Sequence, residues 1–157
     1  MQRNDTNSVW SWSGQMQGDS AVSPSTLQTL IRSLQGDHRT FLTYYDHGRR
    51  VRRLSFDQLY VEAYQAAARI HAAFGHQTNP DDRIAIISTN SDDLIIAYCA
   101  CFLLGVIVVP INPNESESYI ERIVQHARCK LAITQGKKIN LPCAGVTMAE
   151  LAQGRTQ

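Results

Sequence analysis

Three short polar stretches follow apolar runs in this 157-residue sequence and are the first candidates for binding a small ligand. They are Ser88-Thr89-Asn90-Ser91, Asn112-Pro113-Asn114 and Thr134-Gln135-Gly136. In parallel α/β sheets, ligands usually bind beyond the carboxyl ends of the strands. All three stretches are polar, as the lining of a site would be. Polar loops are, however, also what any α/β protein has at these positions.

A cluster of arginines is the only concentrated positive charge. It consists of Arg49, Arg50, Arg52 and Arg53. One interpretation is an exposed, solvated hairpin, and the other is a contact with a phosphate group or an acidic partner. The sequence leaves both open.

The cysteines and histidines show no catalytic or metal-binding spacing. Cys99 and Cys101 stand two apart on a predicted helix and so point to different sides. Buried thiols in a reducing compartment explain the four cysteines, and a metal or redox site is the alternative. His71 and His76 have no liganding neighbours and are interpreted as surface residues. We assign no catalytic, cofactor-binding or metal-binding residue.

An uncharged run of eighteen residues, 94–111, decides whether these groups belong to a membrane protein. It reads LIIAYCACFLLGVIVVPI, which reaches the lower limit for crossing a bilayer as a helix. Its first part suits a helix capped by Ser91 and ended by Gly105. Residues 106–109 are all β-branched, as in a strand buried on both faces, and Pro110 suits a strand end. We therefore predict a helix followed by a strand, without a membrane span.

Further patterns predict the remaining elements. A helix begins with Ser23 as its cap and Pro24 at its first position, and residues 40–56 form a hairpin that turns at residues 46–48. Helices begin at capping boxes formed by Ser55 with Gln58, Ser118 with Glu121, and Thr147 with Glu150. Residues 84–87 and 130–134 are further apolar strands.

This order of elements predicts an α/β fold. It is a parallel β-α-β-α-β unit with right-handed crossovers, preceded by a helix and a β-hairpin. We expect a disordered leader over residues 1–22 and a single α/β domain over residues 23–157. Trp10 and Trp12 stand out in the leader: they dock on the protein or a partner, or belong to an untidy leader.

Charge and terminal sequence narrow the class of function. A net charge of +1 and an isoelectric point near 7.7 give no field argument for nucleic acid or an anionic membrane. The polar sequence MQRNDTNSVW has no apolar signal core, so we expect a cytoplasmic protein.

Residues from about 25 to 134 resemble the N-terminal region of adenylate-forming (AMP-binding) enzymes. These comprise acyl-CoA synthetases, the adenylation domains of peptide synthetases, and luciferases. A helix start of the family is matched by Ser55, Phe56 and Leu59, and its Asp-Arg-Val-Ala-Ile strand by residues 82–86. An Asn-Ser turn is matched by Asn90 and Ser91. A Gly-Ala-x-x-x-Pro-x-x-Pro segment is matched by Gly105, Pro110 and Pro113, with Val106 in place of Ala.

The resemblance implies a partial N-terminal subdomain. Members of the family bind ATP with a Ser/Thr/Gly-rich loop of the type TSGTTGxPK, in which closely spaced glycines expose backbone N–H groups to phosphate. The nine glycines here are never closer than four residues apart, at 14, 18, 36, 48, 75, 105, 136, 145 and 154. We therefore expect no cofactor in this chain, with ATP and Mg²⁺ needed only by a complete enzyme.

Two functions from different classes follow. The first is an N-terminal fragment or subunit of an ATP-dependent carboxylate-activating ligase, inactive alone. The second is a non-catalytic interaction protein that retains part of the adenylation fold and binds a protein partner; an unrelated α/β binding module is a third. We expect self-association, or a chain that supplies the missing adenylation segments, because part of the apolar surface would otherwise lie uncovered. No nucleic acid is expected as a partner.

Overall fold

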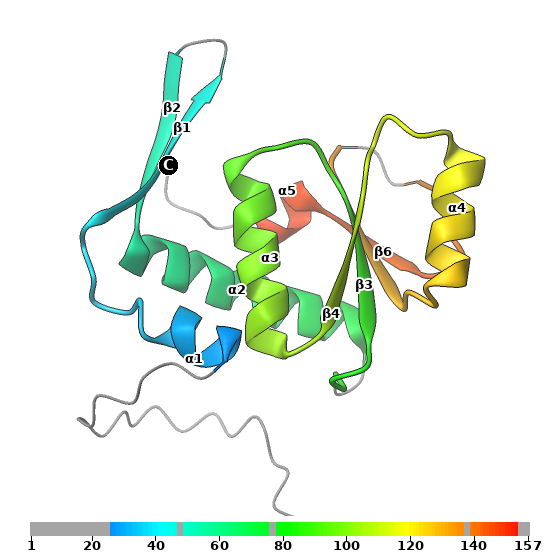
Figure 1. Ribbon diagram of the computed structural model, residues 1–157, viewed down its shortest axis with the longest axis horizontal. Helices are drawn as coiled ribbons and strands as arrows, with labels where there is room; N and C mark the ends of the chain where they lie inside the picture. The colour runs from blue at the N-terminus through cyan, green and yellow to red at the C-terminus, as the bar shows by residue number, and fades with distance from the viewer. Residues whose placement is uncertain (1–25, 47–48, 76–77, 137–138, 154–157) are drawn as a thin grey trace, which may run out of the picture.

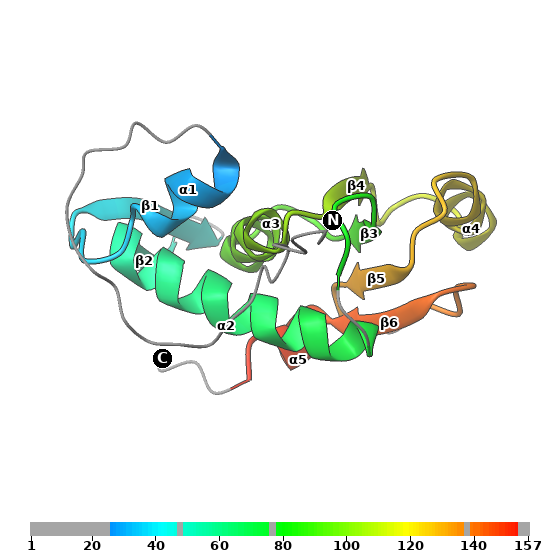
Figure 2. The same ribbon diagram turned by 90° about the horizontal axis from the view of Figure 1, so that it is seen from below.

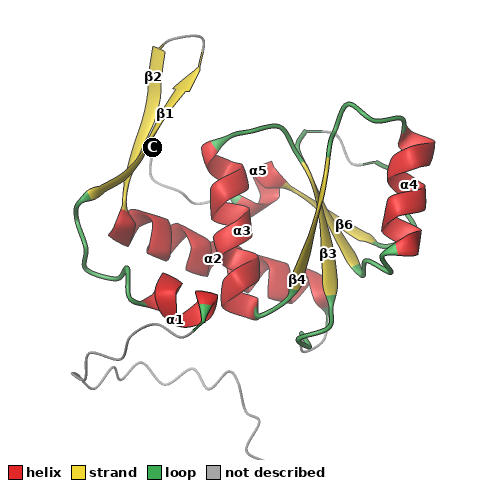
Figure 3. Ribbon diagram, viewed as in Figure 1, coloured by secondary structure: helices red, strands yellow, loops and turns green. Residues whose placement is uncertain are grey.

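The computed structural model describes residues 26–46, 49–75, 78–136 and 139–153. Figures 1 and 2 show a central sheet between two layers of helices, with a hairpin standing apart from it. Figure 3 colours the same view by helices and strands. The predicted leader, with Trp10 and Trp12, lies outside the described residues.

The first helix, α1 (Leu27–Arg32), begins later than predicted. Its cap is Thr26, which forms a capping box with Thr29, so the prediction of Ser23 as the cap is wrong. In this box the hydroxyl of each threonine accepts a hydrogen bond from the backbone N–H of the other. Of the apolar side chains of α1, Ile31 is buried, whereas Leu27 and Leu30 are exposed.

A predicted hairpin follows and is confirmed. Strand β1 (Thr40–Asp46) pairs antiparallel with β2 (Arg49–Ser55), and each strand carries one irregularity in register. Leu54 is buried at its inner face. The hairpin leads directly into α2 (Phe56–Phe74), because Ser55 ends β2 and also caps the helix, in the predicted box with Gln58.

A four-stranded parallel sheet forms the centre of the molecule. Its strands are β3 (Arg83–Ile87), β4 (Ile107–Ile111), β5 (Leu131–Thr134) and β6 (Ala144–Thr147), and their spatial order is β4-β3-β5-β6. Three strands were predicted. The fourth, β6, was not, because its sequence AGVT is short and lacks an apolar run.

Helices cover the two faces of this sheet unequally. One face carries α2, α3 (Asp92–Leu104) and the short α5 (Met148–Leu151), which share a core with Ile84 and Ile86 of β3. The other face carries α4 (Glu117–His126), whose Ile120 and Val124 pack over Ala85 and Ile87. Alternate residues of β3 thus point to the two faces, which explains why all of residues 84–87 are buried.

In addition to Ser55, three predicted caps are confirmed, and in addition to Ser23 one more is wrong. Ser91 caps α3, Gly105 ends it in the left-handed conformation, and Thr147 forms a capping box with Glu150 at α5. Helix α4 is capped by Ser116, two residues before the predicted Ser118. Both are serines ahead of the same apolar face, so the sequence pattern does not distinguish them.

The β-branched run before Pro110 lies at the edge of the sheet, so the prediction of a strand buried on both faces is wrong there. Ile107 is 40% exposed, and Val108 and Val109 are half-buried. The uncharged run is nonetheless a helix followed by a strand, as predicted. Among the described residues, no helix is long and apolar enough to cross a membrane.

Candidate functional site

The carboxyl edge of the sheet joins two of the three predicted polar stretches. The Gln135 side-chain oxygen accepts hydrogen bonds from the Thr89 backbone N–H at 2.9 Å and from the Thr89 hydroxyl at 2.6 Å. The Ser88 hydroxyl lies 3.2 Å from the same oxygen and 2.9 Å from the Thr89 carbonyl, and its one proton can serve only one of these acceptors at a time. The Gln135 backbone N–H donates to the Ile87 carbonyl at 3.0 Å. Because β3 and β5 are parallel neighbours, their carboxyl ends meet there.

Thr134 lies at the same edge and is the one buried polar residue of β5. It is 3% exposed, and its hydroxyl has no hydrogen-bond partner among the described residues. A buried hydroxyl without a partner loses its bonds to water without replacement. Asn112 is separate from this group: its side-chain oxygen accepts from the Asn114 N–H at 3.1 Å, which closes a local turn.

These groups do not fit a triphosphate. The contacts at this edge are made by hydroxyls, an amide oxygen and backbone N–H groups, and the Gln135 oxygen already receives two hydrogen bonds from Thr89. Within the ranges that the structure describes, no group of three or more His, Cys, Asp or Glu is placed to hold a metal ion. The edge can therefore hydrogen-bond a neutral polar group, and no reaction step through ATP follows from it.

Asp82 lies at the other end of the strands, directly before β3. The sequence analysis did not predict it as a charged site, and its role is structural. Its carboxylate is 2% exposed and lies 2.6 Å from the Lys130 ammonium. It also accepts from the Asn79 N–H at 2.8 Å, and its carbonyl accepts from the Ile107 N–H at 2.8 Å. Asp82 thus ties together the turn before β3 and the starts of β4 and β5.

Arg52 departs from a freely solvated arginine cluster. Its guanidinium donates to Asp92 Oδ2 at 2.9 Å and to Glu62 Oε1, so one side chain of β2 bridges α3 and α2. Burial acts to lower its pKa, but the hydrogen bonds and charges of Asp92 and Glu62 outweigh burial and raise the pKa above its usual value. Arg53 is exposed and donates to the Thr40 hydroxyl.

Burial disfavours the thiolate form of the cysteines. All four are free; Cys99, Cys101 and Cys129 are buried and Cys143 is half-buried. Burial raises the pKa of Cys99 and Cys129 to about 11 and that of Cys101 to about 12. Because the thiolate is the reactive form, this burial disfavours reaction at neutral pH. The predicted burial is confirmed for Cys99, Cys101 and Cys129.

A parallel α/β unit preceded by a helix and a hairpin is shared with part of the N-terminal subdomain of adenylation enzymes. The model of the family "AMP-binding enzyme" matches residues 33–155, and the chain belongs to this family. The predicted resemblance and the predicted fold class are thereby confirmed.

Curated relatives are moderately similar over the shared region. The chain is 33% identical over 102 residues to a 2-succinylbenzoate–CoA ligase of Bacillus licheniformis, a match that covers 65% of this chain and 18% of that protein. It is 29% identical over 102 residues to the phenyloxazoline synthase MbtB of Mycolicibacterium paratuberculosis, covering 64% of this chain and 8% of that protein. The chain therefore spans less than a fifth of either relative.

Solved structures share the fold at lower sequence identity. The N-terminal subdomain of Klebsiella oxytoca NpsA, in complex with 3-hydroxybenzoyl-AMSN, has a TM-score of 0.66 at 22% identity and covers 83% of this chain and 31% of that one. The O-succinylbenzoate coenzyme A synthetase MenE of Bacillus subtilis, in complex with AMP, has a TM-score of 0.67 at 21% identity, covering 83% and 33%. At this identity the likeness concerns the fold alone.

Proposed function

We propose that this chain is an N-terminal fragment or subunit of an ATP-dependent carboxylate-activating ligase. In such a reaction an acid and ATP give an acyl-adenylate and pyrophosphate, and the acyl group then passes to a thiol. The observation that carries the proposal is the family match over residues 33–155, together with a relative named as a CoA ligase. ATP and Mg²⁺ belong to the complete enzyme, and the proposed location is the cytoplasm.

The chain alone is proposed to be inactive. Its glycines are too widely spaced for a phosphate loop of the family type. Phosphoryl and adenylyl transfer depend on positioned donors and cations that stabilise developing charge. The polar carboxyl edge supplies donors, but its described contacts include no cationic side chain.

Completion by a further chain segment, a partner chain or a second copy is part of the same proposal. Helix α3 has no charged residue from Leu94 to Leu104, yet Ile95, Tyr98 and Phe102 form a half-buried stripe along it. A helix that is apolar all round is normally covered on every side. In Figures 1 and 2 this helix and the edge strand β4 lie toward the same side of the molecule.

The backbone geometry of the edge strand β4 indicates how a further segment or chain packs on this surface. The Ile107 N–H points to β3, where it bonds the Asp82 carbonyl, so Val108 and Pro110 are the residues whose backbone groups point outward. Proline has no N–H, so this edge offers an incoming strand few donors. We infer that the cover packs against side chains of α3 and β4 and does not extend the sheet.

Carboxylate-dependent exchange of pyrophosphate into ATP tests the catalytic part of the proposal. We expect no exchange above a protein-free control across a panel of aromatic and aliphatic acids. Robust exchange by the pure 157-residue chain would contradict it. A longer product of the same gene, if it restores exchange, would support the ligase function.

Sedimentation equilibrium tests the uncovered surface. We expect the pure chain to self-associate with rising concentration and to bind an apolar dye. Ile107→Lys on β4 should weaken association. Val61→Lys on α2, outside the proposed surface, should not, and it is a matched control because the two side chains are exposed to 40% and 42%. A monomer that binds no dye at any concentration argues for an independent small domain.

A further inference from the structure

The β1–β2 hairpin exposes more apolar surface than a solvated hairpin needs. Three of its side chains are prominent: Phe41 is 39% exposed, Tyr45 59% and Val51 60%. Phe41 and Val51 fall where the register shifts, between Thr40 and Leu42 and between Arg50 and Arg52. Each is the extra residue of a bulge, and bulges re-aim a side chain.

The same hairpin carries a one-sided charge. Its sequence from residue 40 to residue 55 contains four arginines and one acid, Asp46. Arg52 is paired with two carboxylates, whereas exposed Arg53 donates to a neutral hydroxyl, that of Thr40. Arg49 and Arg50 add two formal charges at the start of β2. The sequence of the hairpin is therefore basic, and its described side chains include exposed apolar ones.

Contacts with the body of the protein hold this surface in place. Arg52 connects β2 to Glu62 of α2 and Asp92 of α3, Leu54 is buried, and the Phe41 and Phe56 rings lie 5.1 Å apart. A surface fixed before binding loses less conformational freedom when it binds. In Figure 1 the hairpin projects from the rest of the fold, and its two strands form a sheet of their own.

An open hollow of about 560 Å³ lies at the base of the hairpin. It is lined by His38, Thr40, Arg53, Ser55, Asp57 and Gln58. The lining contains one cationic side chain that could donate to a carboxylate, Arg53, and one acidic side chain, Asp57. The hollow thus lies between the base of the hairpin and the first turn of α2.

We propose that the hairpin binds an acidic segment of a protein partner that carries apolar residues among its carboxylates. Charge complementarity indicates that the partner carries carboxylates, because arginine guanidinium groups pair with carboxylates in bidentate geometry. The three exposed apolar side chains of the hairpin require apolar residues in the partner, and a phosphate backbone does not provide them. The near-neutral whole chain, with a net charge of +1, also gives no long-range attraction for nucleic acid. This proposal does not depend on the ligase function.

Fluorescence anisotropy with defined probes tests the proposal on the full chain. The probe is a labelled 12-residue peptide that repeats Glu-Asp-Phe-Glu-Asp-Leu, and its matched control replaces Phe and Leu by Ser. We expect salt-dependent binding of the first peptide and at least tenfold weaker binding of the second. Equal affinity for both peptides, or no binding, would overturn the proposal.

Variants locate the site. The double variant Arg49→Glu with Arg50→Glu should weaken peptide binding at least tenfold, and so should Tyr45→Ser with Val51→Ser, which keeps the charge. The control is Arg122→Glu with Arg128→Glu, two exposed arginines on and after α4, and should bind like the parent. Urea midpoints establish that each variant is folded. Binding that survives in both hairpin variants, or that is lost equally in the control, would place the interaction elsewhere.

Two further probes test the other partners that a basic surface could bind, nucleic acid and anionic membranes. A single-stranded oligonucleotide and vesicles containing phosphatidylserine present phosphate groups without the peptide's apolar side chains. We expect both to bind more weakly than the acidic–apolar peptide. Tighter binding of either one, lost in the arginine variant, would assign the hairpin to phosphate contacts and overturn the proposal.

Discussion

The Arg52 guanidinium donates to Asp92 Oδ2 at 2.9 Å, across 40 residues of sequence. Asp92 lies in the first turn of α3, where a carboxylate also interacts favourably with the helix N-terminus. With Glu62 as the second acceptor, this contact fixes the hairpin against two helices at once. The side chains of all three residues are less than a quarter exposed, so water screens the charges only in part.

Replacing Arg52 tests this bridge. Arg52→Ala removes a cation that two half-buried carboxylates share and should lower the free energy of unfolding by about 2 kcal/mol. Arg52→Lys keeps the charge but lacks the fork that reaches both acceptors, so an intermediate loss is expected. Urea unfolding measures both. Arg53→Ala, which removes an exposed arginine bonded to a hydroxyl, is the matched control; equal losses for Arg52→Ala and Arg53→Ala would mean that the bridge adds nothing.

Gly105 should tolerate substitution less well than Gly75, although both end helices at positive φ. Gly105 has φ 70° and Gly75 φ 66°, so a side chain strains the backbone at each by about 1–2 kcal/mol. At Gly105 an added Cβ would also lie 2.8 Å from Gln28 Nε2, whereas Gly75 faces open space.

A double-mutant cycle separates the two costs. Gly105→Ala should destabilise the protein more than Gly75→Ala in urea unfolding. In a Gln28→Ala background the excess should shrink, since the clash is gone. Equal losses at the two glycines in both backgrounds would show that the Gln28 contact yields without cost.

Local sequence patterns predicted much of the fold. The helices α2 and α3 were identified from their caps, Ser55, Ser91 and Gly105, because capping depends on residues close in sequence. Strand β6 and the edge position of β4 were missed. Strand pairing is decided by the tertiary fold, and a β-branched run has the same composition at an edge as in the middle of a sheet. Pro110 was the one local signal for an edge.

The site residues were predictable in kind but not in their contacts. That Ser88, Thr89 and Gln135 lie together follows from the rule that parallel strands end at one edge. That the Gln135 oxygen is occupied, and that the Thr134 hydroxyl has no partner among the described residues, depends on side-chain packing. Asp82 with Lys130 and Arg52 with Asp92 are likewise long-range pairs that a single sequence does not show.

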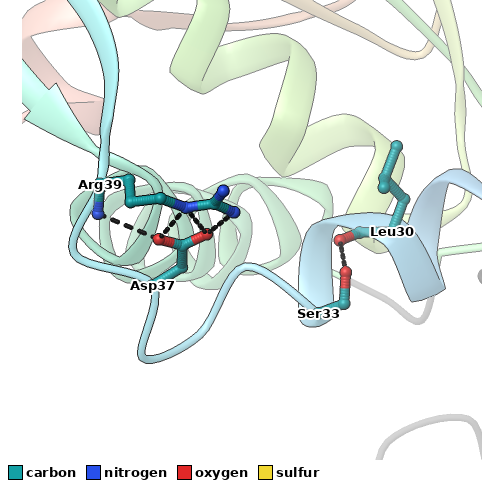
Figure 4. Close-up of polar contacts among 4 residues, drawn as sticks. All are labelled: Leu30, Ser33, Asp37 and Arg39. Carbon is teal, nitrogen blue, oxygen red and sulfur yellow. Dashed lines mark hydrogen bonds and ion pairs between the residues drawn. The ribbon is translucent and has the colours of Figure 1, made fainter. Parts of the chain in front are cut away.

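Asp37 should titrate well below an ordinary aspartate. Its carboxylate receives hydrogen bonds from the Arg39 side chain, at 2.6 Å to Oδ2, and from the Arg39 N–H, at 3.0 Å (Figure 4). The hydrogen bonds from the Arg39 side chain, and next that from its backbone, lower the pKa of Asp37 from 3.8 to about 2. Figure 4 also shows the Ser33 hydroxyl donating to the Leu30 carbonyl at 2.7 Å, which closes the end of α1 just before this turn.

The pH dependence has a definite sign. Because the folded-state pKa lies below the unfolded value, the contribution of Asp37 to stability is complete above pH 3.8 and is lost as the pH falls toward 2. Carbon-13 NMR of the side-chain carboxyl should give a midpoint near 2 in the folded protein. Arg39→Ala should move it up toward 3.8, while Arg53→Ala should leave it unchanged. If the Asp37 midpoint did not change in Arg39→Ala, the Arg39 guanidinium would be ruled out as the cause of the lowered pKa.

Two threonines at the carboxyl edge should respond in opposite directions when their hydroxyls are removed. Thr134→Val replaces a buried, unpartnered hydroxyl by a methyl group of similar size, so the free energy of unfolding should stay the same or rise by up to about 1 kcal/mol. Thr89→Val removes the 2.6 Å donor to the Gln135 oxygen and should cost about 0.5–1 kcal/mol. Thr78→Val, at a second buried hydroxyl without a partner among the described residues, is the control and should behave like Thr134→Val. Urea unfolding gives all three values. A clear loss for Thr134→Val with none for Thr78→Val would mean that the Thr134 hydroxyl has a partner in solution, such as an ordered water bound at the carboxyl edge.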